Sequence, residues 1–299
     1  MNIRQAAERI FRLSHIDPEN GVQRPDQSEE IRSFVAEIKA EFERRKEERR
    51  DFELQWRMNQ NFVGGNQYCD IVQTTGELVD LIPALDTEMM SVYNQLAPIV
   101  ETRLSKLAAV HPGLTVRPAT SDNSDITAAR VSTRLLKTEY AAMAMKRKGL
   151  VADTWMEQNG GVFVKSVWNP HAGRIIGWMD GKPVHEGDLS VTVVPYYEMF
   201  PSSSYVESLE ECDSVIQAKV YTRDQIMLRW GVEIDGQDMN VFTLDTTGVF
   251  SGGNGYNHSM PRIRDGLMKD SELVLEYFEK PNALFPEGRH AIIIGDYCA

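Results

Sequence analysis

Apolar side chains recur every three or four residues between Ser28 and Gly65, and this spacing predicts one long amphipathic helix. The positions that follow the spacing are Ile31, Val35, Ile38, Phe42, Phe52, Trp56 and Val63. Arg45 and Arg49 occupy the same line between Phe42 and Phe52, so the apolar seam contains a charged gap. Two glycines, Gly64 and Gly65, follow and predict the end of the helix.

The helical pattern continues beyond this first helix. Residues 86–110 predict a second helix that Asp86 caps and that Pro98 kinks or splits in two. Residues 121–159 predict one or two further helices, with Asp122 or Ser124 as the cap.

At Gly160-Gly161 the pattern changes to short apolar runs with a period of two, which predicts strands. "GVFVKSVWN" (161–169) predicts a strand, and "RIIGWM" (174–179) predicts its hairpin partner after the turn "PHAG". Further strands are predicted at 189–200, 212–221, 271–280 and 288–297, and a short capped helix at 222–231. The rest of 231–268 is polar and glycine-rich, which is typical of loops.

These elements predict an α+β architecture of long N-terminal helices followed by a β-rich region. The predicted divisions are an N-terminal arm or linker at 1–26, a helical part at 27–159 and a β-rich part at 160–299. The last residues, "AIIIGDYCA", predict a strand that stops without a completed turn. We therefore expect a chain truncated at Ala299 from a longer protein.

Composition is that of a globular protein that can bury a core, with 42% hydrophobic and 25% charged residues among 299. The net charge of -12 is unevenly distributed. Residues 1–150 hold 21 basic and 22 acidic side chains, and residues 151–299 hold 11 and 22. An acidic surface repels phosphate, which argues against tight nucleic-acid binding by the second half. No apolar run reaches membrane-spanning length, so no membrane contact is expected.

Patterns typical of enzymes and metal sites are missing. "SGGNGYN" (251–257) lacks the strand, lysine and helix that a phosphate-binding loop needs. The six histidines have no metal-ligand spacing, and Cys69, Cys212 and Cys298 form no CxxC, so we expect reduced thiols and no cofactor. Two acidic clusters, 210–213 and 233–238, leave a hydrolase as a remote alternative, and solvated surface is the simpler interpretation. We predict no catalytic, cofactor-binding or metal residues.

The stretch 44–57 holds six basic and four acidic side chains. Because the acids can pair with the bases one turn away, as in Glu47-Arg50, a solvated or subunit-facing helix is favoured over a DNA-binding arm. The candidates for a subunit interface or a DNA-proximal surface are Arg44, Arg45, Lys46, Arg49, Arg50 and Trp56. We expect Arg45 and Arg49 to pair with acids of another chain or another element. A nucleic-acid adaptor that uses this helix remains the alternative.

Several segments, taken in order, resemble portal (head–tail connector) proteins of tailed bacteriophages. They are "FELQWRMNQNFVGGNQY" (52–68), "VYNQLAPIVETRLSKLAAVHPGLTVRPATSDNSDITAARVSTRLLKTEY" (92–140), "NGGVFVKSVWNPHAGRIIG" (159–177), "GDLSVTVVPYYEMFPSSSYVESLEECDSVI" (187–216), "YTRDQIMLRWG" (221–231) and "EYFEKPNALFPEGRHAIIIGDY" (276–297). The second segment is the most specific, and the order of all six carries the resemblance.

The resemblance implies the wing region of a portal subunit. Such proteins form rings, typically dodecamers, at one capsid vertex, and double-stranded DNA passes through the channel without sequence specificity. The implied partners are the terminase packaging motor, major capsid and scaffold proteins, and tail adaptor proteins. The implied location is the virion, after assembly in the host cytoplasm. The family's stem, clip and crown have no counterpart that can be assigned here, and portal proteins are not enzymes.

Overall fold

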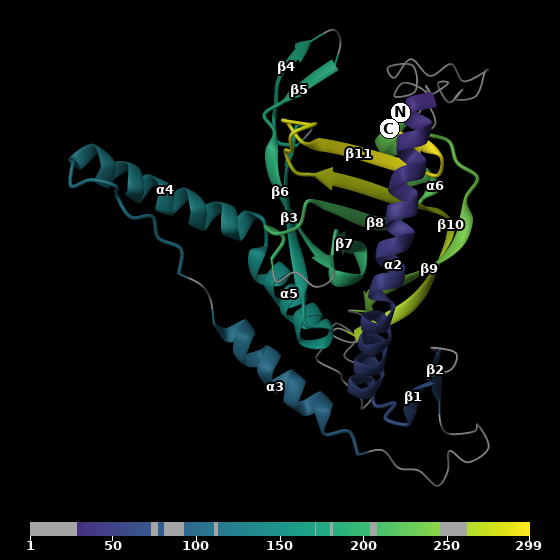
Figure 1. Cartoon of the computed structure of the whole chain (residues 1–299). Coiled ribbons are helices and arrows are strands. Elements are labelled where there is room, and N and C mark those ends of the chain that lie inside the picture. The colour runs from purple at the N-terminus through teal and green to yellow at the C-terminus, as the bar shows by residue number, and fades with distance from the viewer. Residues whose placement is uncertain are drawn as a thin grey trace, which may run out of the picture. The chain divides into compact units, whose positions relative to one another are not determined.

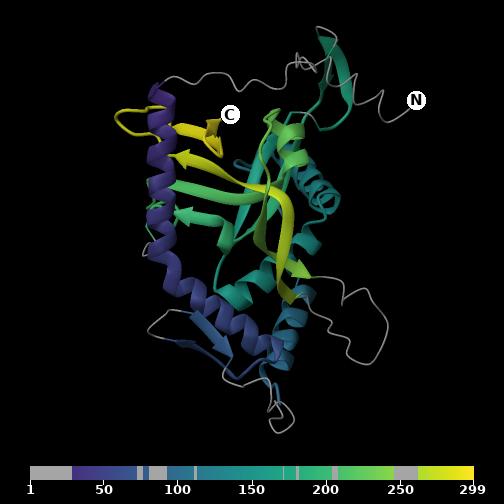
Figure 2. The same ribbon diagram turned by 90° about the vertical axis from the view of Figure 1, so that its right-hand side faces the viewer.

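The computed structural model describes residues 29–72, 77–80, 93–110, 113–170, 172–179, 182–203, 208–245 and 262–299 (Figures 1 and 2). In this part of the chain, a long helix and further helices precede antiparallel sheets, which confirms the predicted α+β class. The predicted arm at 1–26 lies outside the described residues.

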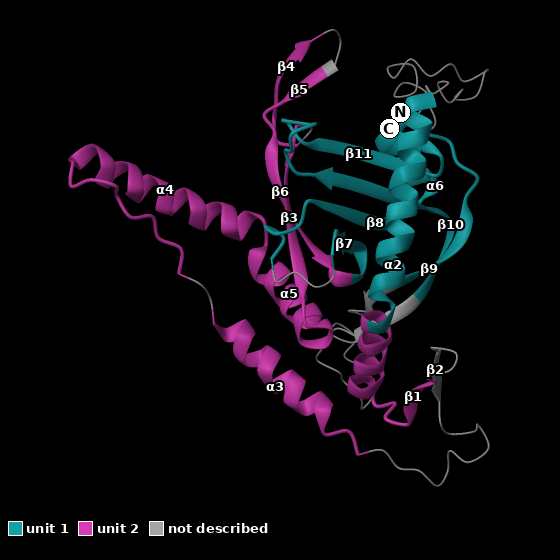
Figure 3. Ribbon diagram, viewed as in Figure 1, with its two compact units in different colours: residues 1–51, 197–243, 263–299 teal, residues 52–196, 244–262 magenta. Residues whose placement is uncertain are grey.

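Two compact units divide the chain (Figure 3). Unit 1 contains Met1–Asp51, Tyr197–Thr243 and Ile263–Ala299, and unit 2 contains Phe52–Tyr196 and Leu244–Arg262. Both units combine helices with strands, whereas the sequence-based division at residue 160 separates helices from strands.

Unit 1 is built on one antiparallel sheet. Its strands are β7 (Met199–Pro201), β8 (Ser214–Thr222), β9 (Gln237–Asp245), β10 (Arg262–Glu279), β11 (Arg289–Ile294) and β12 (Tyr297–Cys298). They lie in the order β12-β11-β10-β8-β7, and β9 pairs with β10. The sequence analysis missed β9, which falls in the stretch predicted as loops. It also missed the turn to β12, so "AIIIGDYCA" forms a hairpin instead of an interrupted strand.

Each face of this sheet carries its own apolar cluster, because successive strand residues point to opposite faces. On one face, Leu275 and Ile293 join Val35, Ile38 and Phe42 of helix α2 (Glu29–Gly64). On the other face, the neighbouring strand residues Val274 and Ile294 pack with Ile226 of helix α6 (Arg223–Trp230), Val232 and Ile234. Helices α2 and α6 therefore cover opposite faces of the unit 1 sheet (Figure 2).

Helix α6 has the ends that its sequence predicts. The Thr222 side chain accepts from the Gln225 amide while the Gln225 side chain accepts from the Thr222 amide, which forms a capping box. Gly231 follows in the left-handed conformation with φ 68°. Since α6 buries only Ile226 of its own residues, these caps matter to its stability.

Unit 2 contains the C-terminal part of α2 and three further helices, α3 (Leu96–Ala109), α4 (Asn123–Ala142) and α5 (Met145–Asn159). Its strands are β1 (Cys69–Val72), β2 (Glu77–Asp80), β3 (Val162–Asn169), β4 (Ile175–Met179), β5 (Lys182–His185) and β6 (Asp188–Pro195). They pair as β1-β2, β3-β6 and β4-β5. A single 3-10 turn, η1 (Tyr196–Glu198), leads from β6 into β7.

The predicted helix at 86–110 begins later than expected. Residues 86–92 lie outside the described residues, and α3 starts at Leu96 after Asn94, whose Oδ1 accepts from the amides of Leu96 and Ala97. Pro98 therefore lies in the first helical turn, where its missing N–H needs no partner. Helix α3 runs unbroken through Pro98, so Pro98 does not split the described part of the predicted helix.

The prediction of one or two helices in 121–159 is confirmed, and the structure has two. Asp122 precedes α4, and Ala144 separates α4 from α5 in the left-handed conformation with φ 52°.

The hairpin predicted between β3 and "RIIGWM" is wrong. β3 pairs with β6, from Val162 opposite Pro195 to Asn169 opposite Asp188, and β4 pairs with β5. The sequence between β4 and β5 is Asp180-Gly181, a dipeptide typical of tight hairpin turns. This turn signal is stronger than that of "PHAG", and it explains why the chain reverses after β4.

Candidate functional site

The charged segment of α2 folds so that its two central arginines face inward. Arg45 and Arg49 fall on the same face as Val35, Ile38 and Phe42, which are all buried. Both arginine side chains are only 3% exposed. A charge buried this deeply is costly unless it is fully paired, so their contacts decide what this segment can do.

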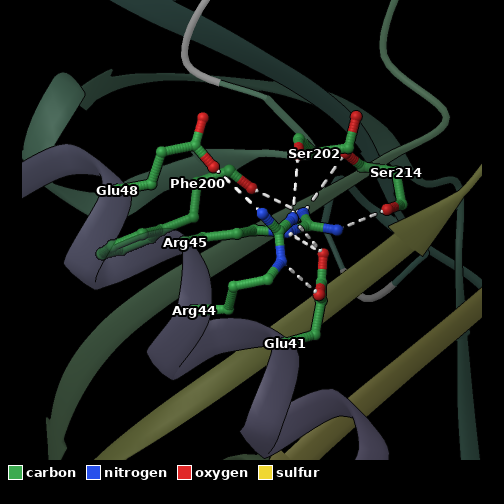
Figure 4. A network of polar contacts seen from close by, with 7 residues as sticks. All are labelled: Glu41, Arg44, Arg45, Glu48, Phe200, Ser202 and Ser214. Atoms are coloured by element: carbon green, nitrogen blue, oxygen red, sulfur yellow. Dashed lines mark hydrogen bonds and ion pairs between the residues drawn. The ribbon is translucent and has the colours of Figure 1, made fainter.

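Arg45 is held by oxygens of its own helix and of two strands (Figure 4). Its Nε donates to Glu41 Oε1 at 2.9 Å. One terminal nitrogen donates to the Phe200 carbonyl at 2.9 Å, and the other donates to Ser214 Oγ at 2.6 Å. The Ser214 carbonyl lies 3.4 Å from the first nitrogen. The guanidinium fork thus ties α2 to β7 and β8 at once.

Arg49 makes a similar contact one turn later. Its two terminal nitrogens donate to the carbonyl oxygens of Met199 at 2.8 Å and Tyr197 at 2.9 Å. Its guanidinium carbon lies 3.6 Å from the centre of the Phe200 ring, which adds a cation–π contact.

These contacts correct the expectation for Arg45. The acid that pairs with it is Glu41 of the same helix, and the other element supplies carbonyl oxygens instead of carboxylates. β7 is an edge strand of the unit 1 sheet, and edge strands present unpaired carbonyls to solvent. Arg45 and Arg49 cover carbonyls at this edge. The two arginines that interrupt the apolar seam therefore fasten the helix to the sheet.

The other basic side chains of the segment are exposed and paired on the helix. Arg44 donates to Glu41 at 2.7 Å and to Glu48 at 3.0 Å, and it also reaches the Ser202 carbonyl at 3.1 Å. Lys46 lies 3.2 Å from Glu43. The predicted Glu47–Arg50 pair is confirmed at 3.4 Å. The positive charge available to a phosphate is therefore smaller than the sequence count suggests.

Glu41 lies at the centre of this network. The hydrogen bond from Arg44, followed by that from Arg45, outweighs the effect of partial burial and lowers the pKa of Glu41 to about 2. The same pairing raises the pKa of Arg44 above its ordinary value. The carboxylate is thus charged at neutral pH.

Replacing Glu41 by glutamine is expected to flatten the dependence of stability on pH below pH 4.5. A carboxyl whose pKa is lowered in the folded state contributes stability above its unfolded pKa, and this contribution disappears as the pH falls toward the folded pKa of about 2. Glu41 is 30% exposed, so we expect a loss of about 1–2 kcal/mol between pH 5 and pH 2.5 in the wild type, and a smaller loss in Glu41→Gln. Urea unfolding at a series of pH values measures this.

Glu43→Gln is the matched control, because Glu43 and its partner Lys46 are more than half exposed. An equal flattening in both variants would contradict the role given to Glu41.

Trp56 lies in unit 2 and is 7% exposed. Its ring packs edge-on against Tyr196, with ring centres 4.9 Å apart. Tyr196 in turn lies over Gly161, where a Cβ would come within 2.7 Å of the ring. Trp56 is therefore a core residue of unit 2. Of the predicted seam, Ile31 and Phe52 are exposed at 39% and 44%.

The acidic clusters are spread over the surface of unit 1. Glu210, Glu211 and Asp213 are exposed in the turn before β8. Glu233 pairs with Arg223 at 2.7 Å, and Asp238 accepts from the Asp270 amide at 3.4 Å. Within the described residues, no three His, Cys, Asp or Glu side chains gather in a way that could hold a metal ion. The three cysteines are free thiols.

Two exposed surfaces of unit 2 are not among the residues predicted from the sequence. The β4–β5 ribbon displays Ile175, Ile176, Trp178 and Met179, each more than half exposed. Helix α4 displays Val131 and Leu135 beside exposed Arg130, Arg134 and Lys137. Helix α4 holds three basic side chains against two acidic ones, so its charge count gave no signal for this surface.

Comparison with models of known protein families and with curated proteins gives no match. Among the described helices, none has both the length and the apolar character needed to cross a membrane.

Proposed function

We propose that the chain is the wing region of a portal subunit of a tailed bacteriophage. In this proposal, copies of the chain form a ring at one capsid vertex, and DNA passes through the ring during packaging and ejection. The terminase motor, capsid and scaffold proteins, and tail adaptors dock on it. The resemblance of six segments in order, all within an α+β chain, supports the proposal.

The observation that carries it is the apolar surface of unit 2 that the described part of the chain leaves uncovered. Eight large apolar side chains on α4 and the strands β3 and β4 are more than half exposed: Val131, Leu135, Val164, Trp168, Ile175, Ile176, Trp178 and Met179. The four on β4 follow one another along a single strand, with only Gly177 between them, and monomeric proteins rarely expose such an apolar patch. Neighbouring subunits in a ring would cover it.

The acidic second half of the sequence fits the same role. Residues 151–299 hold twice as many acidic as basic side chains. Tight attraction to phosphate would oppose the sliding of DNA through a channel, so a surface of this sign suits passage without binding.

The alternative, a nucleic-acid adaptor that uses residues 44–57, has less support. Arg45 and Arg49 are buried against carbonyl oxygens, and Arg44, Lys46 and Arg50 pair with acids of their own helix. An adaptor of this kind would show steeply salt-dependent binding that weakens when Arg44, Lys46 and Arg50 become glutamine.

The purified full chain is expected to form closed rings of uniform size with a central hole. Mass photometry gives the number of copies, and class-averaged electron micrographs show whether the ring closes. A monodisperse monomer across the accessible concentration range, with scaffold and capsid proteins also present, would contradict the proposed function.

A further inference from the structure

The strands β3 to β6 form a ribbon, which we call the arm, and no described residues form a layer over its far end. β3 pairs with β6, and backbone hydrogen bonds from Glu186 to Arg174 and from Gly187 to Ala172 continue the pairing toward β4 and β5. We call β4 and β5 the arm tip. A two-stranded ribbon alone is marginally stable in water, because it has no apolar layer to pack on.

The arm tip is more apolar than a solvated hairpin. Ile175, Ile176, Trp178 and Met179 are exposed at 53%, 67%, 70% and 69%. These four side chains account for all but one residue of β4. Such a surface is typical of a binding element and not of a strand that stays in solvent.

Trp168 lies at the base of the arm tip and is held in place although it is 63% exposed. Its indole lies against Gly187, where a Cβ would overlap Cζ2 of the ring and lie 2.7 Å from Cε2. Gly187 has φ 80°, a conformation that favours glycine. An exposed aromatic ring fixed in this way is a preorganised anchor.

Helix α4 has an outer face with complementary chemistry. Val131 and Leu135, one turn apart, are each 60% exposed. Arg130, Arg134 and Lys137 form an exposed basic row beside them, as the helical spacing requires. Within the described part of the chain, none of these three cations forms an ion pair. The opposite face holds the buried Ala129 and Thr133, whose hydroxyl accepts from the Val116 amide.

Two acidic side chains lie on the arm next to Trp168. Glu186 and Asp188 flank Gly187, beside the Trp168 ring, and both are exposed. Neither forms an ion pair among the described residues. Arg174 lies just before β4, where its carbonyl accepts from the Glu186 amide. An apolar patch bordered by acids thus stands on the arm, and an apolar row bordered by bases stands on α4.

We propose that the arm of one copy docks on the outer face of α4 of a second copy. Trp178, with Ile176 two residues before it, covers Val131 and Leu135, and Glu186 and Asp188 face Arg134 and its basic neighbours. The arm tip and α4 lie at separate ends of unit 2 (Figure 3), so one chain presents both halves of the contact to different neighbours.

A contact between two different surfaces of one chain is heterologous, and heterologous contacts generate rings or open filaments. Trp168, Trp178 and Ile176 can bury roughly 400 Å² on the arm side of the contact, about half of the 800 Å² per partner in a standard interface. The chemistry of these two surfaces supports the contact. That a series of such contacts closes into a ring rests on the proposed function.

Charge reversal tests the contact by mixing two variants of the full chain. One variant carries Arg134→Glu and Lys137→Glu on α4, and the other carries Glu186→Lys and Asp188→Lys on the arm. Each alone is expected to self-associate at least tenfold more weakly than the wild type, because like charges then meet across the contact. Mixed in equal amounts, the variants are expected to assemble together, because every contact between unlike copies regains opposite charges. Sedimentation velocity measures both states.

Apolar variants complete the experiment. Ile176→Ser with Trp178→Ser is expected to weaken self-association by 10-fold to 100-fold. Leu228→Ser is the matched control, since Leu228 is 80% exposed on α6 of unit 1 and lies outside both surfaces. Circular dichroism checks that each variant folds.

The outcomes separate this inference from the proposed function. If the wild type assembles and all variants assemble equally well, the inference is wrong and the proposed function stands. If each variant alone loses assembly and the mixture does not regain it, a copy-to-copy charge contact is also ruled out. Loss of binding to duplex DNA or to lipid vesicles, with self-association unchanged, would assign the arm to another partner. A wild type that stays monomeric overturns both.

Discussion

Replacing Arg45 by alanine is expected to lower the free energy of unfolding by about 3–5 kcal/mol. The substitution removes a guanidinium that is 3% exposed and bonded to Glu41, to the Phe200 carbonyl and to Ser214 Oγ. It leaves buried oxygens of β7 and β8 without donors, and it opens a cavity between the helix and the sheet. Urea unfolding at pH 7, followed by circular dichroism, measures the loss.

Two controls separate the effect of the buried guanidinium contacts from the effect of removing a positive charge from the helix. Arg44→Ala removes a neighbouring arginine that is 53% exposed, and it is expected to cost at most about 1 kcal/mol. Arg45→Lys keeps the charge, but a single ammonium cannot reproduce the planar fork, so roughly half of the alanine effect is expected. Equal losses for Arg44→Ala and Arg45→Ala would show that the buried contacts contribute nothing special.

The long helix and its limits could be predicted from the sequence, because both depend on local signals. Apolar spacing placed Val35, Ile38 and Phe42 on one face, and Gly64-Gly65 marked the end. The same spacing placed Arg45 on that face. It could not show that the oxygens opposite Arg45 belong to residues 200 and 214, because contacts across more than 150 residues depend on the fold.

Strand pairing was harder to predict than the presence of strands. The runs that form β3, β4 and β6 are apolar and were recognised as strands, but their partners depend on which turn reverses the chain. β9 contains the apolar residues Met239, Val241, Phe242 and Leu244, but their alternation changes phase between 241 and 242, and the strand is formed by pairing with β10. Such a strand has no strong pattern of its own, so it was predicted as a loop.

The candidate surfaces could likewise be predicted only in part from the sequence. Six basic residues of α2 stood out in the sequence, yet the structure uses two of them as internal ties. The outer face of α4 and the arm tip attract less notice in the sequence. They become evident only when the remaining chain leaves them exposed, because burial is a property of the whole fold.

A second tight contact in unit 1 joins Gly236 to Asp270 of β10. Asp270 has φ 49°, a conformation that is unfavourable for residues other than glycine. The next residue, Ser271, is fully buried, and its Oγ lies 2.9 Å from the Met268 carbonyl and 3.1 Å from the Gln237 carbonyl. These contacts hold the chain around Gly236 close to the backbone of β10.

Replacing Gly236 by alanine is expected to lower the free energy of unfolding by about 2–4 kcal/mol. A Cβ at this position would overlap Asp270 Oδ1 and lie 2.7 Å from the Asp270 carbonyl carbon and 2.8 Å from its Cα. Since two of these three atoms belong to the backbone of a paired strand, rotation of a side chain cannot relieve the overlap. Thermal and urea unfolding both measure the effect.

Gly177→Ala is the control, because a Cβ at Gly177 meets no atom within 4 Å. We expect Asp270→Gly to recover part of the stability lost in Gly236→Ala. Glycine removes the overlapping carboxylate and tolerates the left-handed conformation, so the backbone of β10 can shift without added strain. If Gly236→Ala unfolds like the wild type, or if Asp270→Gly fails to restore any stability, the close approach of residue 236 to Asp270 does not limit the stability of unit 1.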